Sequence, residues 1–359
     1  MTTVLMCQQG IPFEISPART QTVNELRQRG SDVILFFPGR VKDEKLRKQV
    51  KRIVNTTGLD NKIIRNKIKE INPDIVICST VEDTNICFPL PYIMKNTDFY
   101  YYNLEIYVPD VNTETCSIDE RILKRGIYTI SKLREILYVK GCRSIVIQDS
   151  LRKKILKKYW ISHPKTWLIP NSYYKEQNVY NVPHKNGVIY SGSVGNNVLG
   201  SFMAHAKEIK DIEITICGWR YPDLNVKDNP NIKVLKQNLA QDEYTEFISA
   251  YDIALIWYSD KRDDNVYNIG LASGKYFKHL SLGQPVIINN VPYLADEVKK
   301  YKVGEVINDL GELSDAVNSI KLNYDYYVQN IKNRYEKRYD FRKAARRFFD
   351  DIINNVKDK

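Results

Sequence analysis

The chain has 359 residues, of which 43% are hydrophobic and 27% charged, and its formal net charge is +11. A single hydrophobic core seldom grows beyond about 250–300 residues, so the length predicts two domains, and the ordinary globular composition excludes a disordered chain. No apolar run approaches the roughly 20 residues of a membrane span, and the short apolar start before Gln8 is typical of a first strand, not of a signal peptide.

Short apolar runs alternate with amphipathic stretches through the first half of the chain, a pattern typical of βαβ units and a parallel sheet. The expected strands are 4–7, 32–37, 75–79, 98–103, 143–148 and 166–169. The expected helices are 18–29, 59–71 and 151–159. The polar stretch 173–186 has no periodicity and predicts a linker between two domains.

A second alternation of the same kind begins after this linker. Its expected strands are 188–190, 213–217, 232–235, 253–257 and 285–288, and its expected helices are 242–250 and 274–282. In the last segment, from Phe341 to Val356, apolar residues recur at the spacing of one helical face. Such a stripe needs apolar surface to pack on, either in the same chain or on a partner.

The six cysteines are scattered singly, without a C-x-x-C pair, and most lie in apolar runs such as the one that ends at Cys78. This pattern indicates buried free thiols in a reducing compartment, so we expect a cytoplasmic protein. The four histidines show no metal-ligand spacing, and Asp263-Asp264 is an adjacent pair, unlike the spaced Asp-x-Asp pair of metal-dependent transferases. No metal site is therefore expected. The dinucleotide fingerprint and the P-loop are absent too.

Positive charge is concentrated between Arg121 and Lys165, where Lys and Arg far outnumber the acidic residues Glu135 and Asp149. A patch of this kind suits anionic membrane lipid, a phosphorylated carrier lipid or nucleic acid. A solvated face that only keeps the protein soluble explains it equally well.

Two segments point to a bound phosphate. The strand that ends at Tyr190 runs into the small residues 191–196, whose backbone amides would approach a ligand closely. Lys275 stands in the first turn of a predicted helix, where a cation opposes the helix dipole unless an anion is bound there. A plain tight turn and an exposed lysine are the simpler alternatives.

The run 273–287 is similar to the donor-site helix of GT-B glycosyltransferases, whose pattern is roughly S-P-N-K-L-F-E-Y-L-A-x-G-K-P-V-I. Other segments also resemble parts of that family, and they are 101–105, 145–156 with 167–171, 188–195, 214–219 and 231–258. The resemblance covers essentially the whole chain and is strongest from 188 to 310. It is closest to the family 4-like bacterial branch that keeps the lysine and lacks the paired glutamates, because Gly270 and Lys278 stand at the matching positions.

The resemblance implies an α/β GT-B fold, with two Rossmann-like domains facing across a cleft. Residues 1–172 would bind the acceptor and 187–340 the nucleotide sugar, while the C-terminal helix, 341–359, would cross back to the first domain. The implied donor-binding residues are Gly192, Ser193, Val194, Gly195, Asn196, Gly218, Arg220, Ser273, Gly274 and Lys275. Gln9 and Gly10 would lie on the acceptor side, and Glu14 or Glu105 would be the catalytic base of an inverting enzyme.

The implied reaction moves a sugar from a nucleoside diphosphate sugar, expected to be a UDP-sugar, to a hydroxyl of a glycan or lipid-linked glycan. It needs no cofactor, metal or nucleic acid, and we favour retention of configuration. Bacterial surface polysaccharide synthesis, such as capsule or O-antigen assembly, is the expected setting, with 121–165 resting on the inner face of an anionic membrane. One alternative is a catalytically degenerate GT-B partner, which the missing glutamates favour. The other is a sugar-nucleotide epimerase, which is disfavoured because no histidine is expected near the donor loop.

Overall fold

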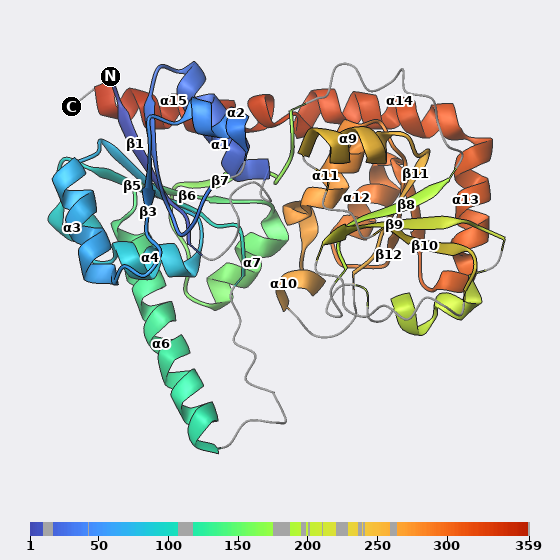
Figure 1. Ribbon diagram of the computed structural model, residues 1–359, viewed down its shortest axis with the longest axis horizontal. Coiled ribbons are helices and arrows are strands. Elements are labelled where there is room, and N and C mark those ends of the chain that lie inside the picture. The colour runs from blue at the N-terminus through green and yellow to red at the C-terminus, as the bar shows by residue number, and fades with distance from the viewer. Residues whose placement is uncertain are drawn as a thin grey trace. The chain divides into compact units, whose positions relative to one another are not determined.

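The computed structural model of the protein describes residues 1–9, 17–41, 43–106, 118–174, 187–194, 199, 202–209, 211–219, 229–235, 239, 241–258 and 264–357. The chain divides into two compact units (Figure 1). Unit 1 comprises Met1–Asn171 and Ala344–Lys359, and unit 2 comprises Ser172–Lys343.

Unit 1 is built on a parallel sheet with the strand order β3-β2-β1-β4-β5-β6-β7. Its strands are β1 (Thr3–Cys7), β2 (Asp32–Phe37), β3 (Arg52–Asn55), β4 (Ile75–Cys78), β5 (Asp98–Tyr102), β6 (Ser144–Ile147) and β7 (Thr166–Leu168). Every residue of β4 and β5 is buried, because helices cover both faces of a parallel sheet. The strand order reverses beside β1, and in such sheets ligands bind outside the carboxyl ends at that point.

The helices of unit 1 begin at residues suited to capping. They are α1 (Pro17–Gln28), α2 (Glu44–Gln49), α3 (Asn61–Ile71), α4 (Val81–Cys87), α5 (Leu90–Ile93), α6 (Ile118–Gly141), α7 (Ser150–Lys158) and most of α15 (Phe341–Lys357). The side chains of Asp60, Thr80 and Asp149 each accept a hydrogen bond from a backbone N–H in the first turn of α3, α4 and α7.

The aromatic strand β5 joins helices on both faces of this sheet. The rings of Tyr100 and Tyr102 pack edge to face on Phe348 of α15, with centroid distances of 6.0 and 6.3 Å. Phe99 and Tyr101 point to the opposite face, where both pack on one tyrosine of α6. This alternation follows from the two-residue period of a strand.

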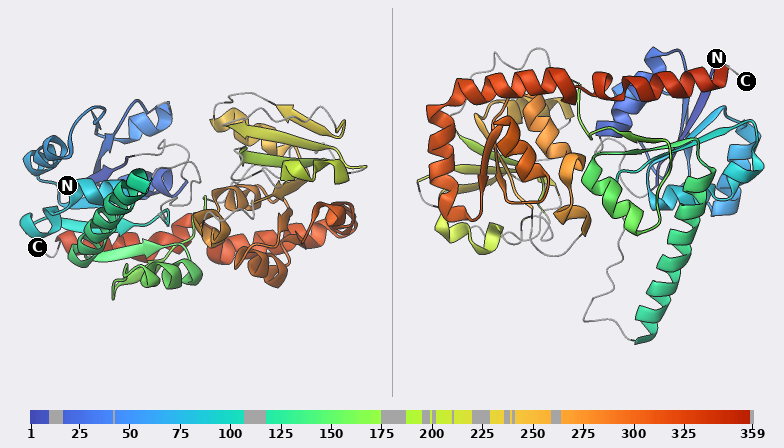
Figure 2. Two further views of the ribbon diagram at one scale, coloured as in Figure 1. Left: turned by 90° about the horizontal axis from the view of Figure 1, so that it is seen from below. Right: turned by 180° about the vertical axis from the view of Figure 1, so that it is seen from behind.

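The apolar stripe of α15 is buried in unit 1, as Figure 2 shows for the red helix that runs along this sheet. Phe348 is 1% exposed and Phe349 is 0% exposed. On the rim of the contact, Arg29, the residue after α1, forms an ion pair with Asp350 at 3.2 Å. The helix therefore finds its apolar partner within the same chain.

Unit 2 repeats the architecture with the parallel strand order β10-β9-β8-β11-β12-β13. Its strands are β8 (Val188–Ser193), β9 (Ile214–Trp219), β10 (Ile232–Leu235), β11 (Ile253–Ile256), β12 (Val286–Asn289) and β13 (Gly304–Ile307). Its helices are α9 (Gln241–Ser249), α10 (Asp264–Tyr267), α11 (Gly274–Ser281), α12 (Leu294–Tyr301), α13 (Leu313–Leu322) and α14 (Tyr324–Arg334), and a π-helical turn, η6 (Tyr335–Tyr339), precedes α15. Three short 3₁₀ turns complete it: η3 (Ala206–Glu208), η4 (Gly270–Ala272) and η5 (Leu310–Glu312).

The predicted α/β class, with two parallel-sheet units and a C-terminal helix that returns to the first, is confirmed. The boundaries of the predicted elements shift by up to three residues. The helix expected from residue 59 begins at Asn61, because the side chain of Asp60 caps it. The strands β3 and β13 and the helices α2, α4, α5, α6, α10, α12, α13 and α14 were not predicted.

Candidate functional site

At the carboxyl edge of the unit 2 sheet, a partly buried lysine lies against two tyrosines. Lys275 belongs to the first turn of α11, and its Nζ donates to the Tyr190 hydroxyl at 2.9 Å and to the Trp257 carbonyl oxygen at 3.3 Å. The same nitrogen lies 4.7 Å from the ring centroid of Tyr190 and 4.4 Å from that of Tyr258. Burial penalises the ammonium form and lowers the pKa of Lys275 to about 7.

The helix that carries Lys275 is fixed at its start by a serine cap. Ser273 Oγ accepts a hydrogen bond from the Tyr276 backbone N–H at 3.2 Å and shares a second hydrogen bond with the Tyr258 hydroxyl. Asn289 holds the backbone of Tyr258, since its Oδ1 accepts from the Tyr258 N–H at 3.0 Å and its Nδ2 donates to the Tyr258 carbonyl at 2.7 Å. The positive end of the α11 dipole and Lys275 are thus presented together, an arrangement suited to an anion.

Two glycines let β8 and β9 approach closely beside this lysine. Gly192 pairs with Gly218 across the two strands, and a Cβ on Gly218 would lie 1.7 Å from the Gly192 carbonyl oxygen. Gly192 has a φ of +128°, in the region that favours glycine, and a Cβ there would lie 3.5 Å from Cδ of Lys275. The two segments that the sequence singled out therefore meet in space.

The other residues expected on the donor side have different environments. The Ser193 carbonyl oxygen accepts a hydrogen bond from the Tyr190 hydroxyl at 2.6 Å. Val194 is 0% exposed, so its side chain serves the core, and Gly274 is the first residue of α11. Three of the expected residues lie outside the described part of the chain: Gly195, Asn196 and Arg220.

A histidine of α11 also reaches β8. The ring of His279 is 0% exposed, with Nε2 at 2.7 Å from Ser191 Oγ and Nδ1 at 2.6 Å from Gln284 Oε1. The amide nitrogen of Gln284 donates to two backbone carbonyls, so its Oε1 accepts and Nδ1 of His279 carries the proton. Burial lowers the pKa of His279 to about 4, and the ring is neutral at pH 7.

The expectation that no histidine lies near this loop is therefore wrong. Residues one helical turn apart share a face, which places His279 on the side of α11 that bears Lys275. A neutral imidazole held between Ser191 and Gln284 is a structural bridge and supplies no acid or base to a ligand.

The positions at which related enzymes carry glutamates hold no carboxylate. Gly270 is buried, with a φ of 45°. Lys278 is 5% exposed, and its Nζ lies 5.0 Å from the ring centroid of Tyr173. Neither residue offers an acceptor for the hydroxyls of a ribose.

The carboxyl edge of the unit 1 sheet is organised around a buried carboxylate. Asp83 accepts hydrogen bonds from the backbone N–H groups of Gln9 at 2.7 Å, Ser79 at 2.8 Å and Thr80 at 3.0 Å. Desolvation raises the pKa of Asp83 well above its usual range. The side chain of Gln9, expected on the acceptor side, donates to Thr56 Oγ1 at 3.1 Å. Its expected neighbour Gly10 lies outside the described residues.

Glu105 follows β5 near two buried arginines. Burial lowers the pKa of Arg19 and lowers that of Arg152 to about 10, and the charge of Glu105 opposes both shifts. Arg152 also donates to the Leu104 carbonyl oxygen at 3.1 Å. The other candidate base, Glu14, lies outside the described residues.

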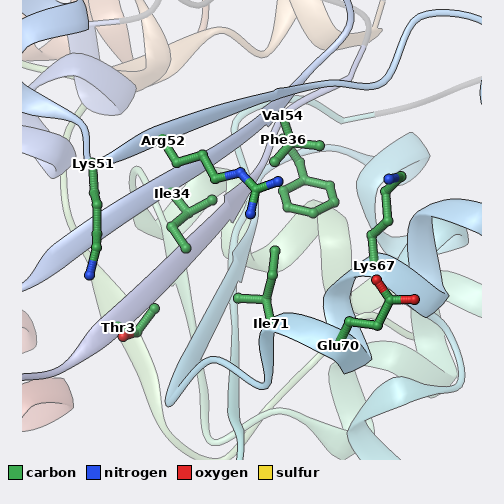
Figure 3. Close-up of a pocket in the computed structure, with 9 residues that line it drawn as sticks. All are labelled: Thr3, Ile34, Phe36, Lys51, Arg52, Val54, Lys67, Glu70 and Ile71. Atoms are coloured by element: carbon green, nitrogen blue, oxygen red, sulfur yellow. The ribbon is translucent and has the colours of Figure 1, made fainter.

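A pocket of about 570 Å³ lies in unit 1 and contains none of the predicted site residues (Figure 3). It lies toward the amino ends of the strands, where Thr3 begins β1 and Arg52 begins β3. Its lining is completed by Ile34, Phe36, Lys51, Val54, Lys67, Glu70 and Ile71. Within the described ranges no group of three or more His, Cys, Asp or Glu side chains could hold a metal ion. None of the helices described combines the length and hydrophobicity of a membrane span.

Comparison with known proteins agrees with this geometry. Residues 188–339 match the family model described as glucosyltransferase 3-like, C-terminal domain. The whole fold is similar to a glycosyltransferase from Rickettsia africae, with 14% identity, a TM-score of 0.66 and coverage of 99% of each chain. The chain has the GT-B fold. No curated protein matches its sequence.

Two further structures share this fold. Alr3699/HepE from Anabaena, in complex with UDP, has 12% identity and a TM-score of 0.70, over 99% of this chain and 100% of that one. WaaG, a glycosyltransferase involved in lipopolysaccharide biosynthesis, has 14% identity and a TM-score of 0.68, over 97% of this chain and 99% of that one. The family match spans β8 to η6 and so includes the Lys275 site.

Sequence reasoning missed several residues of the Lys275 site. Tyr190, Tyr258 and Asn289 are near or just beyond the carboxyl ends of β8, β11 and β12, and none stands in a recognisable motif. The available signal was their position: polar and aromatic residues at the carboxyl ends of neighbouring parallel strands meet at one edge of the sheet.

Proposed function

We propose that this glycosyltransferase uses a UDP-sugar as donor and transfers the sugar to a hydroxyl of a glycan or lipid-linked glycan. The observation that carries the donor half is Lys275, presented with the N-terminus of α11 beside the Gly192 turn. The choice of UDP is supported by Alr3699/HepE, whose structures contain UDP and UDP-glucose. The involvement of WaaG in lipopolysaccharide biosynthesis supports bacterial surface polysaccharide synthesis, such as capsule or O-antigen assembly, as the setting.

Chemically, this site would stabilise the charge that develops on the departing diphosphate. The ammonium group of Lys275 and the dipole of α11 act on that charge from fixed positions, and preorganised groups of this kind contribute most to transfer reactions. The residues at the site supply this stabilisation without a metal ion. We propose retention of configuration, a reaction that needs no catalytic base on the acceptor side. An NMR assay of the product's anomeric configuration tests this, and an inverted product would overturn it.

The donor assignment is tested by thermal unfolding of the protein with UDP, GDP, ADP and UDP-glucose. A ligand that binds only the folded state at 100 times its Kd adds about 2.7 kcal/mol to the free energy of unfolding. We expect this gain with UDP and UDP-glucose, its loss in Lys275→Ala and its retention in the control Lys299→Ala, an exposed lysine of α12. If a nucleotide stabilised both variants equally, or if no nucleotide stabilised the protein, the assignment of Lys275 to the donor site would be refuted.

A catalytically inactive nucleotide-binding subunit is the second candidate, favoured by the lack of carboxylates at Gly270 and Lys278. The two candidates differ in one measurement. An active enzyme releases UDP from UDP-glucose in the presence of a bacterial lipid-linked glycan fraction, whereas a binding subunit shows the thermal shift and releases none.

The proposal extends to membrane contact through the basic stretch 121–165. Figure 1 shows the green helix α6 projecting from the sheet of its own unit. Ile127, Ile130 and Leu133 on this helix are 57%, 53% and 55% exposed, and Arg125 and Arg134 beside them are exposed too. Apolar side chains among basic ones are typical of helices that lie on anionic membranes.

Flotation with vesicles tests this contact. We expect the protein to bind phosphatidylglycerol vesicles at low salt and not phosphatidylcholine vesicles, and we expect Ile127→Ser with Ile130→Ser to weaken binding at least several-fold. Ile63→Ser, at an exposed isoleucine of α3, is the matched control. Indifference to anionic vesicles would exclude the membrane contact.

A further inference from the structure

The hydrogen bonds around Lys275 can be accounted for donor by donor. The hydroxyl of Tyr190 has one proton, which it donates to the Ser193 carbonyl oxygen at 2.6 Å, so its oxygen accepts from Lys275. The Trp257 carbonyl oxygen accepts a second bond at 3.3 Å. These two acceptors satisfy both N–H groups of a neutral amine. The ammonium form has a third N–H, for which the described residues provide no oxygen or nitrogen acceptor.

Aromatic rings replace water around this amino group. Tyr190 is 0% exposed and Tyr258 is 4% exposed, and their ring centroids lie 4.7 and 4.4 Å from Nζ. Ring faces attract a cation, yet they solvate it less well than water does. The resulting desolvation is what brings the pKa of Lys275 to about 7.

Within the described part of the chain, no charged side chain compensates Lys275. The titratable groups packed around it are Tyr190 from β8, Tyr258 after β11 and His279 from its own helix. Burial raises the pKa of both tyrosines and lowers that of His279 to about 4, so all three are neutral at pH 7. Among the described residues, no carboxylate is close enough to shift the pKa of Lys275.

Each tyrosine also ties the lysine to one of the elements that form the site. The hydroxyl of Tyr190 joins Lys275 to the Gly192–Ser193 turn through the Ser193 carbonyl. The hydroxyl of Tyr258 bonds Ser273, the cap of α11. A change at either ring would therefore alter both the position of the amino group and its exposure to water.

We propose that Tyr190 and Tyr258 are positioning residues that hold Lys275 uncharged until the donor diphosphate arrives, so that donor binding takes up a proton. The Nζ lone pair forms the new N–H bond with a proton from the solvent, and this third N–H donates to a diphosphate oxygen. The inference rests on the proposed function, because the anion it requires is the diphosphate of the donor.

Titration calorimetry of UDP-glucose binding, in buffers of different ionisation enthalpy, measures this proton directly. A pKa of about 7 predicts an uptake of about 0.9 proton per UDP-glucose bound at pH 8 and about 0.1 at pH 6. UDP-glucose is suitable because its diphosphate carries no terminal phosphate group that titrates between these values. The affinity for UDP-glucose should fall as pH rises above 7, because binding takes up a proton and the proton concentration of the solvent falls.

Three variants separate positioning from folding. Tyr258→Phe keeps the ring and should keep most of the uptake at pH 8, whereas Tyr258→Ala admits water and should reduce it more than twofold. Lys275→Arg should bind without uptake, because a guanidinium is always charged. Thermal unfolding without ligand shows whether each variant is folded.

The outcomes discriminate between the two proposals. Binding of UDP-glucose without proton uptake at pH 8, or equal uptake in Tyr258→Ala and the unchanged protein, would overturn this inference and leave the donor assignment standing. Failure to bind UDP-glucose at both pH values would overturn the donor assignment and this inference together.

Discussion

Replacing Phe348 with alanine should unfold unit 1 at a much lower temperature. Phe348 is 1% exposed, and its ring packs edge to face on Tyr100, Tyr102 and Trp167, with centroid distances of 6.0, 6.3 and 6.2 Å. These three rings come from β5 and β7, while Phe348 comes from the last helix of the chain. The substitution therefore removes the ring that joins the C-terminal helix to the sheet and leaves a cavity in its place.

The size of the effect follows from the size of the cavity. Truncation of a buried Phe to Ala costs about 3–5 kcal/mol, a figure that includes the loss of its aromatic pairs. Domains are stable by about 5–15 kcal/mol, so this is a large share of the total. For domains of 150–250 residues each kcal/mol lowers the Tm by about 2–4 °C, which gives a loss of about 6–20 °C.

Scanning calorimetry measures the Tm of each transition, and near-ultraviolet circular dichroism follows the surroundings of Trp167. Arg347→Ala, on the exposed face of the same helix, is the matched control and should leave the Tm nearly unchanged. If Phe348→Ala unfolded within about 2 °C of this control, α15 would not be part of the unit 1 core and the packing described above would be refuted.

Three further substitutions test other parts of the structure. Gly218→Ala drives a Cβ into the Gly192 carbonyl and should destabilise unit 2 and abolish UDP binding, whereas Gly126→Ala, in open space on α6, should be neutral or stabilising by up to about 1 kcal/mol; equal thermal shifts would contradict the close strand approach. Asp83→Ala removes the acceptor of three backbone N–H groups and should cost at least about 3 kcal/mol in urea unfolding, and a loss below about 1 kcal/mol would show that water replaces it. The pKa of His279 is about 4 when folded against 6.5 in its ordinary state, so about 3 kcal/mol of stability is present above pH 6.5 and is lost as pH falls toward 4. His279→Gln should lack this part of the acid sensitivity, and an unchanged pH profile would exclude His279 as its source.

The repeating strands and helices were predictable because the apolar runs are long enough to be recognised alone. The four consecutive apolar residues of β4, for example, are all buried. Strand β3 escaped prediction because only one of its four residues, Val54, is buried. Helix α6 escaped because exposed isoleucines such as Ile127 break the expected pattern of a helix with one apolar face.

The residues of the candidate site were likewise only partly predictable from the sequence. Lys275 and Gly192 were recognisable because each is locally unfavourable or unusual, one as a cation at a helix start and the other in a glycine-rich turn. The partners of Lys275 were not recognisable from the sequence. Tyr190 and Tyr258 are distant from it along the chain and approach it only when β8 and β11 pair. The hydrogen bond between His279 and Ser191 was not predictable for the same reason, because these residues are 88 positions apart in the sequence.

The return of α15 to unit 1 affects how the protein is made. Ribosomes add about 5–20 residues per second, so about 10–40 seconds separate the synthesis of Leu168 from that of Phe348. During that time unit 2 is completed, while the aromatic face of β5 and β7 still lacks its cover. The nascent first half therefore exposes the aromatic surface that α15 later covers. Chaperones or neighbouring nascent chains can bind this surface during that interval.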